Sequence, residues 1–149
     1  MMIWWILLAV ILTAVALWAF QTAQRLNRLH IRTDAALAAL QAALDRRAAV
    51  IAALLPEARP LALSAETEPL VHGSFEERAT RERQLSEALI PLGPDLPGRL
   101  IDAEVRVQLA HRFYNDAVAD TRALRLRPLV RVFRLGGTAP LPEFFEYRS

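Results

Sequence analysis

The chain begins with an unbroken run of apolar positions. Residues 3–20 contain no charged side chain and one hydroxyl group, and ten of them are Leu, Ile, Val or Phe. At 1.5 Å per residue a helix of this length covers about 27 Å, close to the ~30 Å hydrocarbon core of a bilayer. Trp4, Trp5 and Trp18 stand near its two ends, where indole rings prefer the membrane interface. The pattern predicts a transmembrane anchor over residues 1–22.

A cleaved signal peptide is the alternative interpretation of this segment. It requires a basic start, an apolar stretch of about 7–15 residues and a small-residue cleavage site after that stretch. The chain lacks the first two features, and its small-residue candidate, residues 14–16, lies inside the apolar run. We therefore expect a retained anchor.

The charges beside the anchor predict its orientation. No Lys or Arg precedes the span, whereas Arg25, Arg28 and Arg32 follow it closely. Basic residues beside a span remain on the cytoplasmic side. We expect a single-pass protein of the cell membrane with its N-terminus outside and its C-terminal domain in the cytoplasm.

An amphipathic pattern follows the anchor without interruption. Apolar or small side chains recur at steps of three and four with a mean near 3.6 residues, which is the period of a straight helix. Residues 3–55 contain no Pro or Gly, so the anchor and this helix, residues 23–55, are expected to form one rod that ends at Pro56. The repeating positions are Leu26, Leu29, Thr33, Leu37, Leu40, Leu44, Ala48, Ile51 and Leu55.

Two further helices are predicted downstream. Ser74 and Glu77 have capping-box spacing and start a short polar helix over residues 74–90, after a proline-containing connector expected to hold at most one helical turn. Residues 98–127 form the third helix. Its buried stripe alternates steps of three and four, with Phe113 and Val118 widening the face. The stripe comprises Leu100, Ala103, Val107, Ala110, Tyr114, Ala117, Thr121 and Leu124.

Together these elements predict an all-α fold. The N-terminal transmembrane helix continues as a long amphipathic helix and packs in an antiparallel bundle of three to four helices. We divide the chain into an anchor at residues 1–22, a helical bundle at 23–127 and a basic, aromatic C-terminal tail at 128–149.

Composition narrows the chemistry that the chain can perform. The chain has no Cys, which excludes disulfides and thiolate chemistry, and all 18 of its basic Lys/Arg side chains are Arg, which excludes a Schiff-base lysine and a P-loop lysine. His30, His72 and His111 are isolated in the sequence and are expected at the surface or at helix interfaces. We expect no catalytic residues, no metal site, no cofactor and no small-molecule substrate.

The third helix carries the residues that resemble a known family. Glu104, the run Ala110-His111-Arg112-Phe113-Tyr114-Asn115-Asp116-Ala117-Val118, Asp120, Pro128 and Phe145-Glu146 resemble the LemA family, as do residues 34–54 with the pair Arg46-Arg47. The resemblance implies a divergent, shortened member with a single N-terminal anchor and a bundle of long helices. It implies no defined biochemical activity.

The charges in this run predict a packing site. Asp116 and Asp120 are four residues apart on one helix face, and like charges at that spacing repel each other unless a cation lies nearby. Arg112 and Arg122 are local candidates, while Arg46 or Arg47 from the long helix would set the register of the two helices. The structural interpretation is that Arg46, Arg47, Tyr114, Asn115, Asp116 and Asp120 form this contact, with the Tyr114 hydroxyl requiring a partner. The alternative is a polar patch for a ligand or partner.

Five arginines without an acidic residue occupy residues 122–134: Arg122, Arg125, Arg127, Arg131 and Arg134. They are either a solvated face or a contact for an anionic surface; nucleic acid binding is not expected, since no recognition motif is present. If the three helices alternate in direction, residue 127 lies at the membrane-distal end, about 45 Å from the exit of the first helix.

We therefore expect a membrane-anchored scaffold or adaptor that self-associates at a bacterial membrane and has no catalytic activity. Its expected partners are the lipid bilayer, further copies of itself and other membrane proteins. The alternative is a lipid-surface or regulatory binding module that uses the arginine-rich C-terminal segment.

Overall fold

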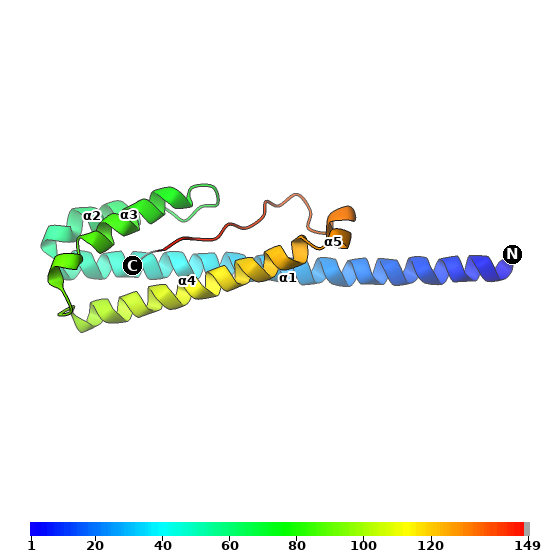
Figure 1. The fold of residues 1–149 in the computed structure, drawn as a ribbon, viewed down its shortest axis with the longest axis horizontal. Helices are drawn as coiled ribbons and strands as arrows, with labels where there is room; N and C mark the ends of the chain where they lie inside the picture. The colour runs from blue at the N-terminus through cyan, green and yellow to red at the C-terminus, as the bar shows by residue number, and fades with distance from the viewer. Residues whose placement is uncertain (148–149) are drawn as a thin grey trace.

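The computed structural model, which describes residues 1–147, consists of helices, short 3-10 turns and irregular segments, without a strand in the described part. The long helix α1 (Met2–Leu54) is continuous, as predicted, and at 1.5 Å per residue its 53 residues span about 80 Å. Its first third projects from the bundle as a bare apolar rod (Figure 1). None of the residues in the 18-residue apolar segment is buried in the bundle, and α1 is long and apolar enough to cross a membrane.

The rest of α1 is the backbone of the bundle. Helix α2 (Arg59–Glu66) folds back on its far end, α3 (Phe75–Glu87) reverses again, and α4 (Gly98–Arg125) returns along α1 toward the bare segment (Figure 1). Short 3-10 turns, η1 (Pro56–Ala58) and η2 (Ile90–Leu92), join these helices at the far end. A short α5 (Pro128–Val132) and an extended C-terminal segment complete the described chain.

The predicted helices are confirmed with shorter ends. Pro56 and Pro128 follow α1 and α4 closely, because a proline cannot donate the next backbone hydrogen bond of a helix. The predicted capping box does not form: the Ser74 hydroxyl donates to the Val71 carbonyl at 3.2 Å instead. The connector holds a whole helix, α2, rather than a single turn.

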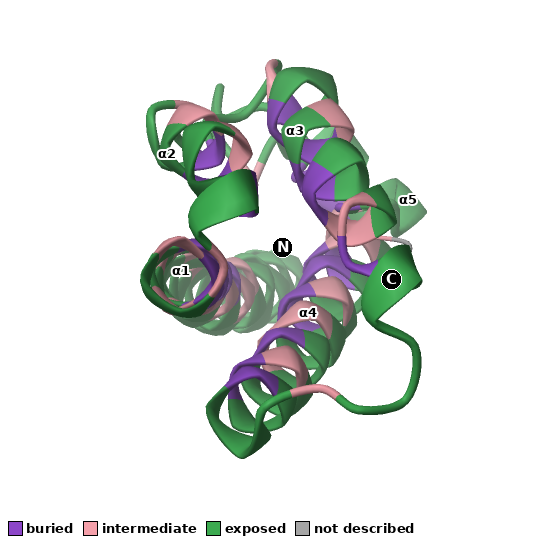
Figure 2. Cartoon of the chain, turned by 90° about the vertical axis from the view of Figure 1, so that its left-hand side faces the viewer, coloured by how far each residue is buried: buried purple, intermediate pink, exposed green. Residues whose placement is uncertain are grey.

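The buried faces of the helices meet along the axis of the bundle, as the view from its far end shows (Figure 2). In α4 the predicted stripe is buried, with only Ala110 partly exposed. Val118 is buried as expected, but the prediction for Phe113 is wrong, because its side chain is 56% exposed. Phe113 lines an open groove between α1 and α4 instead.

The predicted direction of α4, the last long helix, is wrong, because the chain reverses once more at α2. Leu124 of α4 and Val130 of α5 pack against Leu26 of α1, and the rings of Phe133 and Trp18 lie 6.1 Å apart. Residue 127 is therefore beside the apolar start of α1 and not at the opposite end of the bundle, where it was expected. The number of reversals before α4 is three instead of two, which inverts the position of its C-terminus.

Candidate functional site

The predicted arginine pair Arg46-Arg47 separates into one buried and one exposed side chain. Arg47 is 1% exposed and donates to Glu82 of α3 at 2.8 Å, to Ser86 at 2.7 Å and to Glu104 of α4. It thus ties α1 to both α3 and α4. Arg46 is exposed and lines a groove between α1 and α4. The expected pairing with Asp116 or Asp120 is wrong, because Glu82 and Glu104 face this turn of α1.

A second buried arginine extends this cluster. Arg78 of α3 donates to Glu82 at 2.8 Å, to Asp45 of α1 at 2.9 Å and to the Glu68 carbonyl at 2.7 Å. Burial raises the pKa of Glu82, and the two guanidinium groups oppose that shift. The sequence pattern predicted only a short polar helix over residues 74–90, and this buried cluster was not expected. The spacing of Arg78 and Glu82, four residues apart, was the signal available.

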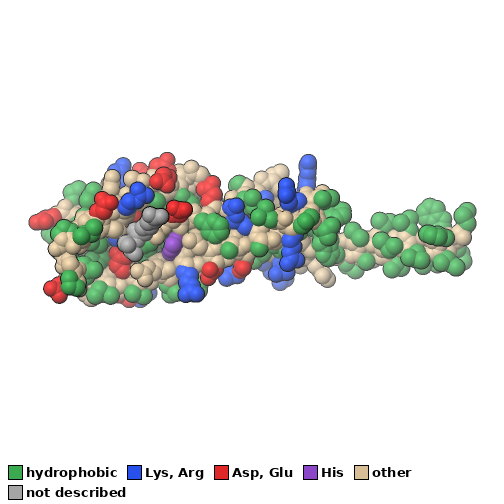
Figure 3. Space-filling model, viewed as in Figure 1, with side chains coloured by type: hydrophobic (Ala, Val, Ile, Leu, Met, Phe, Trp, Pro, Cys, Tyr) green, Lys and Arg blue, Asp and Glu red, His purple; other side chains and the backbone are tan. Residues whose placement is uncertain are grey.

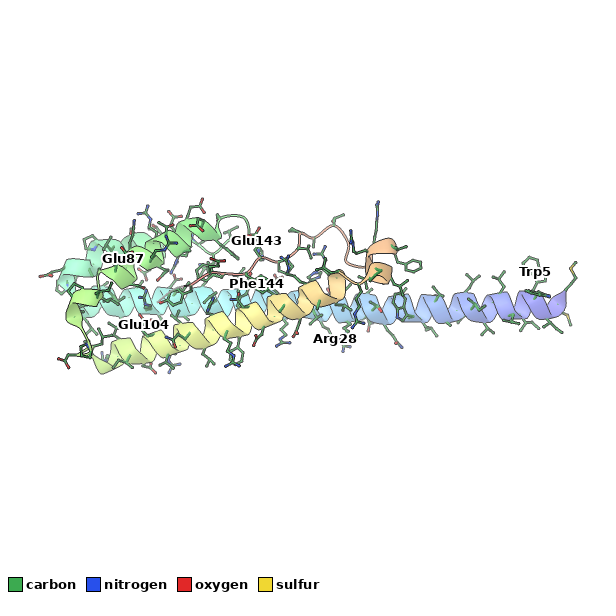
Figure 4. All side chains as sticks on the ribbon, viewed as in Figure 1. Trp5, Arg28, Glu87, Glu104, Glu143 and Phe144 are labelled. Carbon is green, nitrogen blue, oxygen red and sulfur yellow. The ribbon has the colours of Figure 1, made fainter. Side chains whose placement is uncertain are left out.

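Tyr114 and Asn115 hold the C-terminal segment. The Tyr114 hydroxyl is buried and donates to the Glu143 carbonyl at 2.6 Å, which confirms that it requires a partner. Asn115 pairs with the backbone of Phe145 in both directions: its amide donates to the carbonyl at 3.2 Å, and its oxygen accepts from the N–H at 3.1 Å. Both residues therefore hydrogen-bond to the backbone of the extended segment, which runs from α5 back along the bundle beside α4 (Figure 4).

The side chain of Phe145 completes this contact. It is 1% exposed and packs edge to face against Phe75 of α3, with ring centroids 5.8 Å apart. His111 Nε2 lies 2.6 Å from the Phe145 carbonyl oxygen. Tyr147 stacks over Arg47, 5.8 Å from the guanidinium carbon to the ring centre. The extended segment, residues 139–147, thus closes the bundle, and we call it the strap.

The two aspartates of the predicted site do not join it. Asp116 is exposed. Asp120 pairs with Arg32 at 3.0 Å, and both side chains are 55% exposed. Exposed pairs of this kind contribute little to stability. The register between α1 and α4 is set beside them by Thr33 and Thr121, whose buried hydroxyl oxygens lie 3.0 Å apart.

The five arginines of residues 122–134 lie at the anchor end of the bundle, where Figure 3 shows basic side chains gathered beside the bare helix. Arg122 donates to the Pro142 carbonyl at 3.1 Å, and Arg125 donates to the carbonyls of Ala139 and Pro140 at 2.6 and 2.7 Å. These two arginines hold the strap. Arg127, Arg131 and Arg134 are exposed, and within residues 1–147 they form no ion pair. Of the five arginines predicted to contact an anionic surface, Arg127, Arg131 and Arg134 therefore remain as candidates.

One face of the bundle is apolar and open. Ile101, Val105, Leu109 and Phe113 recur every four residues on α4, and each is 48–57% exposed. Beside them lies a groove of about 360 Å³ between α1 and α4. Leu109 and Phe113 line it from α4 together with Ala110 and Arg106. From α1 it is lined by Arg46 and by four small side chains, namely Ala36, Ala39, Ala42 and Ala43.

Side chains that could hold a metal ion do not converge among the described residues. Residues 1–147 contain no group of three or more His, Asp or Glu side chains placed to hold a metal ion. His72 is exposed against Phe75, and His30 and His111 are partly buried at helix contacts, as expected. A cavity of about 530 Å³ lies at the end of the bundle opposite the apolar start of α1, between Leu55 and Leu92, and most of its lining is apolar.

Comparisons with known proteins identify no relative. No family model, curated protein or solved structure matches this chain. Its function must therefore be argued from the geometry described above.

Proposed function

We propose that the protein is a single-pass membrane protein whose cytoplasmic bundle is a scaffold that self-associates and works through its surfaces rather than by catalysis. The length and exposure of the apolar start of α1 support membrane anchoring, since none of this 18-residue apolar segment is buried in the bundle. An exposed apolar surface of that size is unfavourable in water and favourable in a bilayer.

The distribution of charge supports the orientation. The anchor end of the bundle, residues 21–34 and 120–137, contains eight arginines and two aspartates. On the face shown in Figure 3, acidic side chains outnumber basic ones at the opposite end. Because basic residues near a span stay on the cytoplasmic side, the folding of residues 122–134 back to the anchor strengthens the expectation that the bundle is cytoplasmic.

The open apolar face on α4 is the single observation that carries self-association. Ile101, Val105, Leu109 and Phe113 form a continuous apolar ridge on a helix that also bears Arg106, Asp102 and Arg112. Single exposed apolar side chains are common on protein surfaces, whereas a continuous apolar patch marks an interaction surface. The partner must reach this face from beside the bundle, at the same distance from the membrane.

A second copy of the chain meets that condition. Anchored copies share one orientation, so a two-fold axis along the membrane normal keeps every residue at its own height. Leu109 and Phe113 stand at the height of Ala36 and Ala39, because they line the same groove. The ridge of one copy therefore faces the alanine-lined groove of the other, and the same contact repeats on both sides of the two-fold axis.

Substitution of Leu109 tests this proposal. Leu109→Glu introduces a charge at the centre of the ridge and should convert the full-length protein in mild detergent or nanodiscs from dimer to monomer, as measured by analytical ultracentrifugation. Leu63→Glu is the matched control, since Leu63 on α2 is 51% exposed against 52% for Leu109. A monomeric wild-type protein, or equal dimerisation of all three proteins, would refute self-association through this face.

Membership of the LemA family, as a divergent and shortened member, is likewise a proposal. It rests on the residue run around Tyr114 and on the single anchor followed by long helices. The position of the exposed arginines beside the anchor also favours the alternative role, binding to a lipid surface, which is developed below.

A further inference from the structure

A small groove lies where the bundle meets the anchor. Its apolar floor consists of Trp18 from the end of the transmembrane run, Leu124 from α4 and Val130 from α5. Its volume is about 240 Å³. Because Trp18 belongs to the last turn of the apolar run, the groove opens at the level where the hydrocarbon core gives way to headgroups.

The other side of the groove carries hydrogen-bond donors. Arg25 and Thr22 line it from α1, together with Gln21, and Arg127 lines it from the turn that joins α4 to α5. No acidic residue lines the groove, and neither arginine forms an ion pair within residues 1–147. Two unpaired guanidinium groups facing one small space favour a phosphate, which accepts several charge-assisted hydrogen bonds.

The neighbouring surface is suited to the headgroup layer of a membrane. Leu129, Val132 and Phe133 are 50–74% exposed around α5, and the Phe133 ring contacts that of Trp18. Arg131 and Arg134 alternate with them in sequence and are exposed as well. Apolar side chains interleaved with arginines are typical of segments that lie in the membrane interface.

We propose that this groove binds the phosphate headgroup of an anionic phospholipid of the cytoplasmic leaflet, with Arg25 and Arg127 on the phosphate and Trp18, Leu124 and Val130 against the glycerol and upper acyl chain. The inference rests on the proposed membrane anchoring but not on self-association. A headgroup held between α1 and the α4–α5 turn joins the anchor to the bundle and fixes how the bundle stands on the membrane.

Lipid binding to the full-length protein tests this site. Native mass spectrometry in a neutral detergent with added phosphatidylglycerol or phosphatidylcholine should show preferential retention of phosphatidylglycerol. An arginine near the membrane surface contributes about fivefold to the affinity, so Arg25→Gln/Arg127→Gln should weaken phosphatidylglycerol binding by about 30-fold and Arg127→Gln alone by about fivefold. The double variant Arg81→Gln/Arg99→Gln removes the same charge from exposed sites away from the groove and should bind as the wild type does.

Three outcomes would overturn the inference. They are equal retention of the two lipids by the wild type, unchanged binding by Arg25→Gln/Arg127→Gln, and displacement of the lipid by millimolar inorganic phosphate, which would identify a site for free anions. The single Arg127→Gln variant, at an exposed turn, decides the matter if the double variant does not fold.

The same measurements separate this inference from the proposed function. Leu109→Glu should lose dimerisation and keep its lipid preference. Equal retention of the two lipids by a wild-type protein that still dimerises would refute the headgroup site alone. Release of the wild type from membranes by alkaline carbonate would refute the anchoring on which both depend.

Discussion

Arg47→Met is expected to destabilise the bundle strongly, whereas Arg46→Met is not. Arg47 and its partner Glu82 are each 1% exposed, and Arg47 bonds to three side chains from two helices. Methionine fills a similar volume but leaves Glu82 with one carboxylate oxygen unpaired. Removing one member of a buried ion pair costs about 3–5 kcal/mol, because the remaining charge stays desolvated. Arg46 is exposed, and substitutions at such sites are usually within about 0.5 kcal/mol.

Thermal unfolding of the full-length protein in detergent, followed by circular dichroism at 222 nm, measures this difference. A domain of this size shifts by about 4 °C per kcal/mol, so Arg47→Met should unfold about 12–20 °C below the wild type and Arg46→Met within about 2 °C of it. Arg47→Met combined with Glu82→Leu should regain part of the loss, since no unpaired carboxylate then remains at that position. Equal shifts for Arg46→Met and Arg47→Met would refute the assignment of the buried pair.

Three further predictions concern the strap and the anchor end. Asn115→Leu should release the strap, with a loss of about 1–3 kcal/mol from unpaired backbone groups and faster hydrogen exchange at the Phe145 amide, measured by mass spectrometry. Tyr114→Phe should cost about 1 kcal/mol in the same unfolding assay, because one buried hydrogen bond to the strap is lost; an unchanged melting temperature would speak against that bond. Burial and Arg125 lower the pKa of His30, so the unfolded chain binds a proton more readily and stability should fall as the pH drops below about 6.5. His30→Gln should remove part of that decline, and an identical pH profile would count against the shift.

Local sequence patterns determined the lengths and the inward faces of the long helices. The 3.6-residue repeat in α1 and the stripe in α4 depend on side chains a few residues apart, and the prolines at 56 and 128 end both helices through their own backbone chemistry. The need of Tyr114 for a hydrogen-bond partner also followed from its position on the stripe. Its partner, a backbone carbonyl 29 residues away, did not.

The direction of α4 was decided by tertiary structure. It depends on whether residues 59–66 form a helix, and α2 is short and stabilised by burying Ala58, Ala62 and Ala65 against its neighbours. Isolated helices of eight residues are unstable in water, so packing decides whether α2 forms. Because α2 forms, α4 runs back toward the apolar start of α1 and places the arginines of residues 122–134 beside it.

The partners of the charged residues also required the three-dimensional arrangement. Arg46 and Arg47 differ by about 100° around α1, and which of them is buried depends on where α3 and α4 sit. Glu82 and Glu104 come from helices 35 and 57 residues away in the sequence, and no local pattern connects them to Arg47. The sequence by itself thus determined the rod, its apolar anchor and the face of each long helix. Only tertiary packing decided which charges are paired and at which end of the bundle the arginines of residues 122–134 lie, because both depend on contacts between segments far apart in the chain.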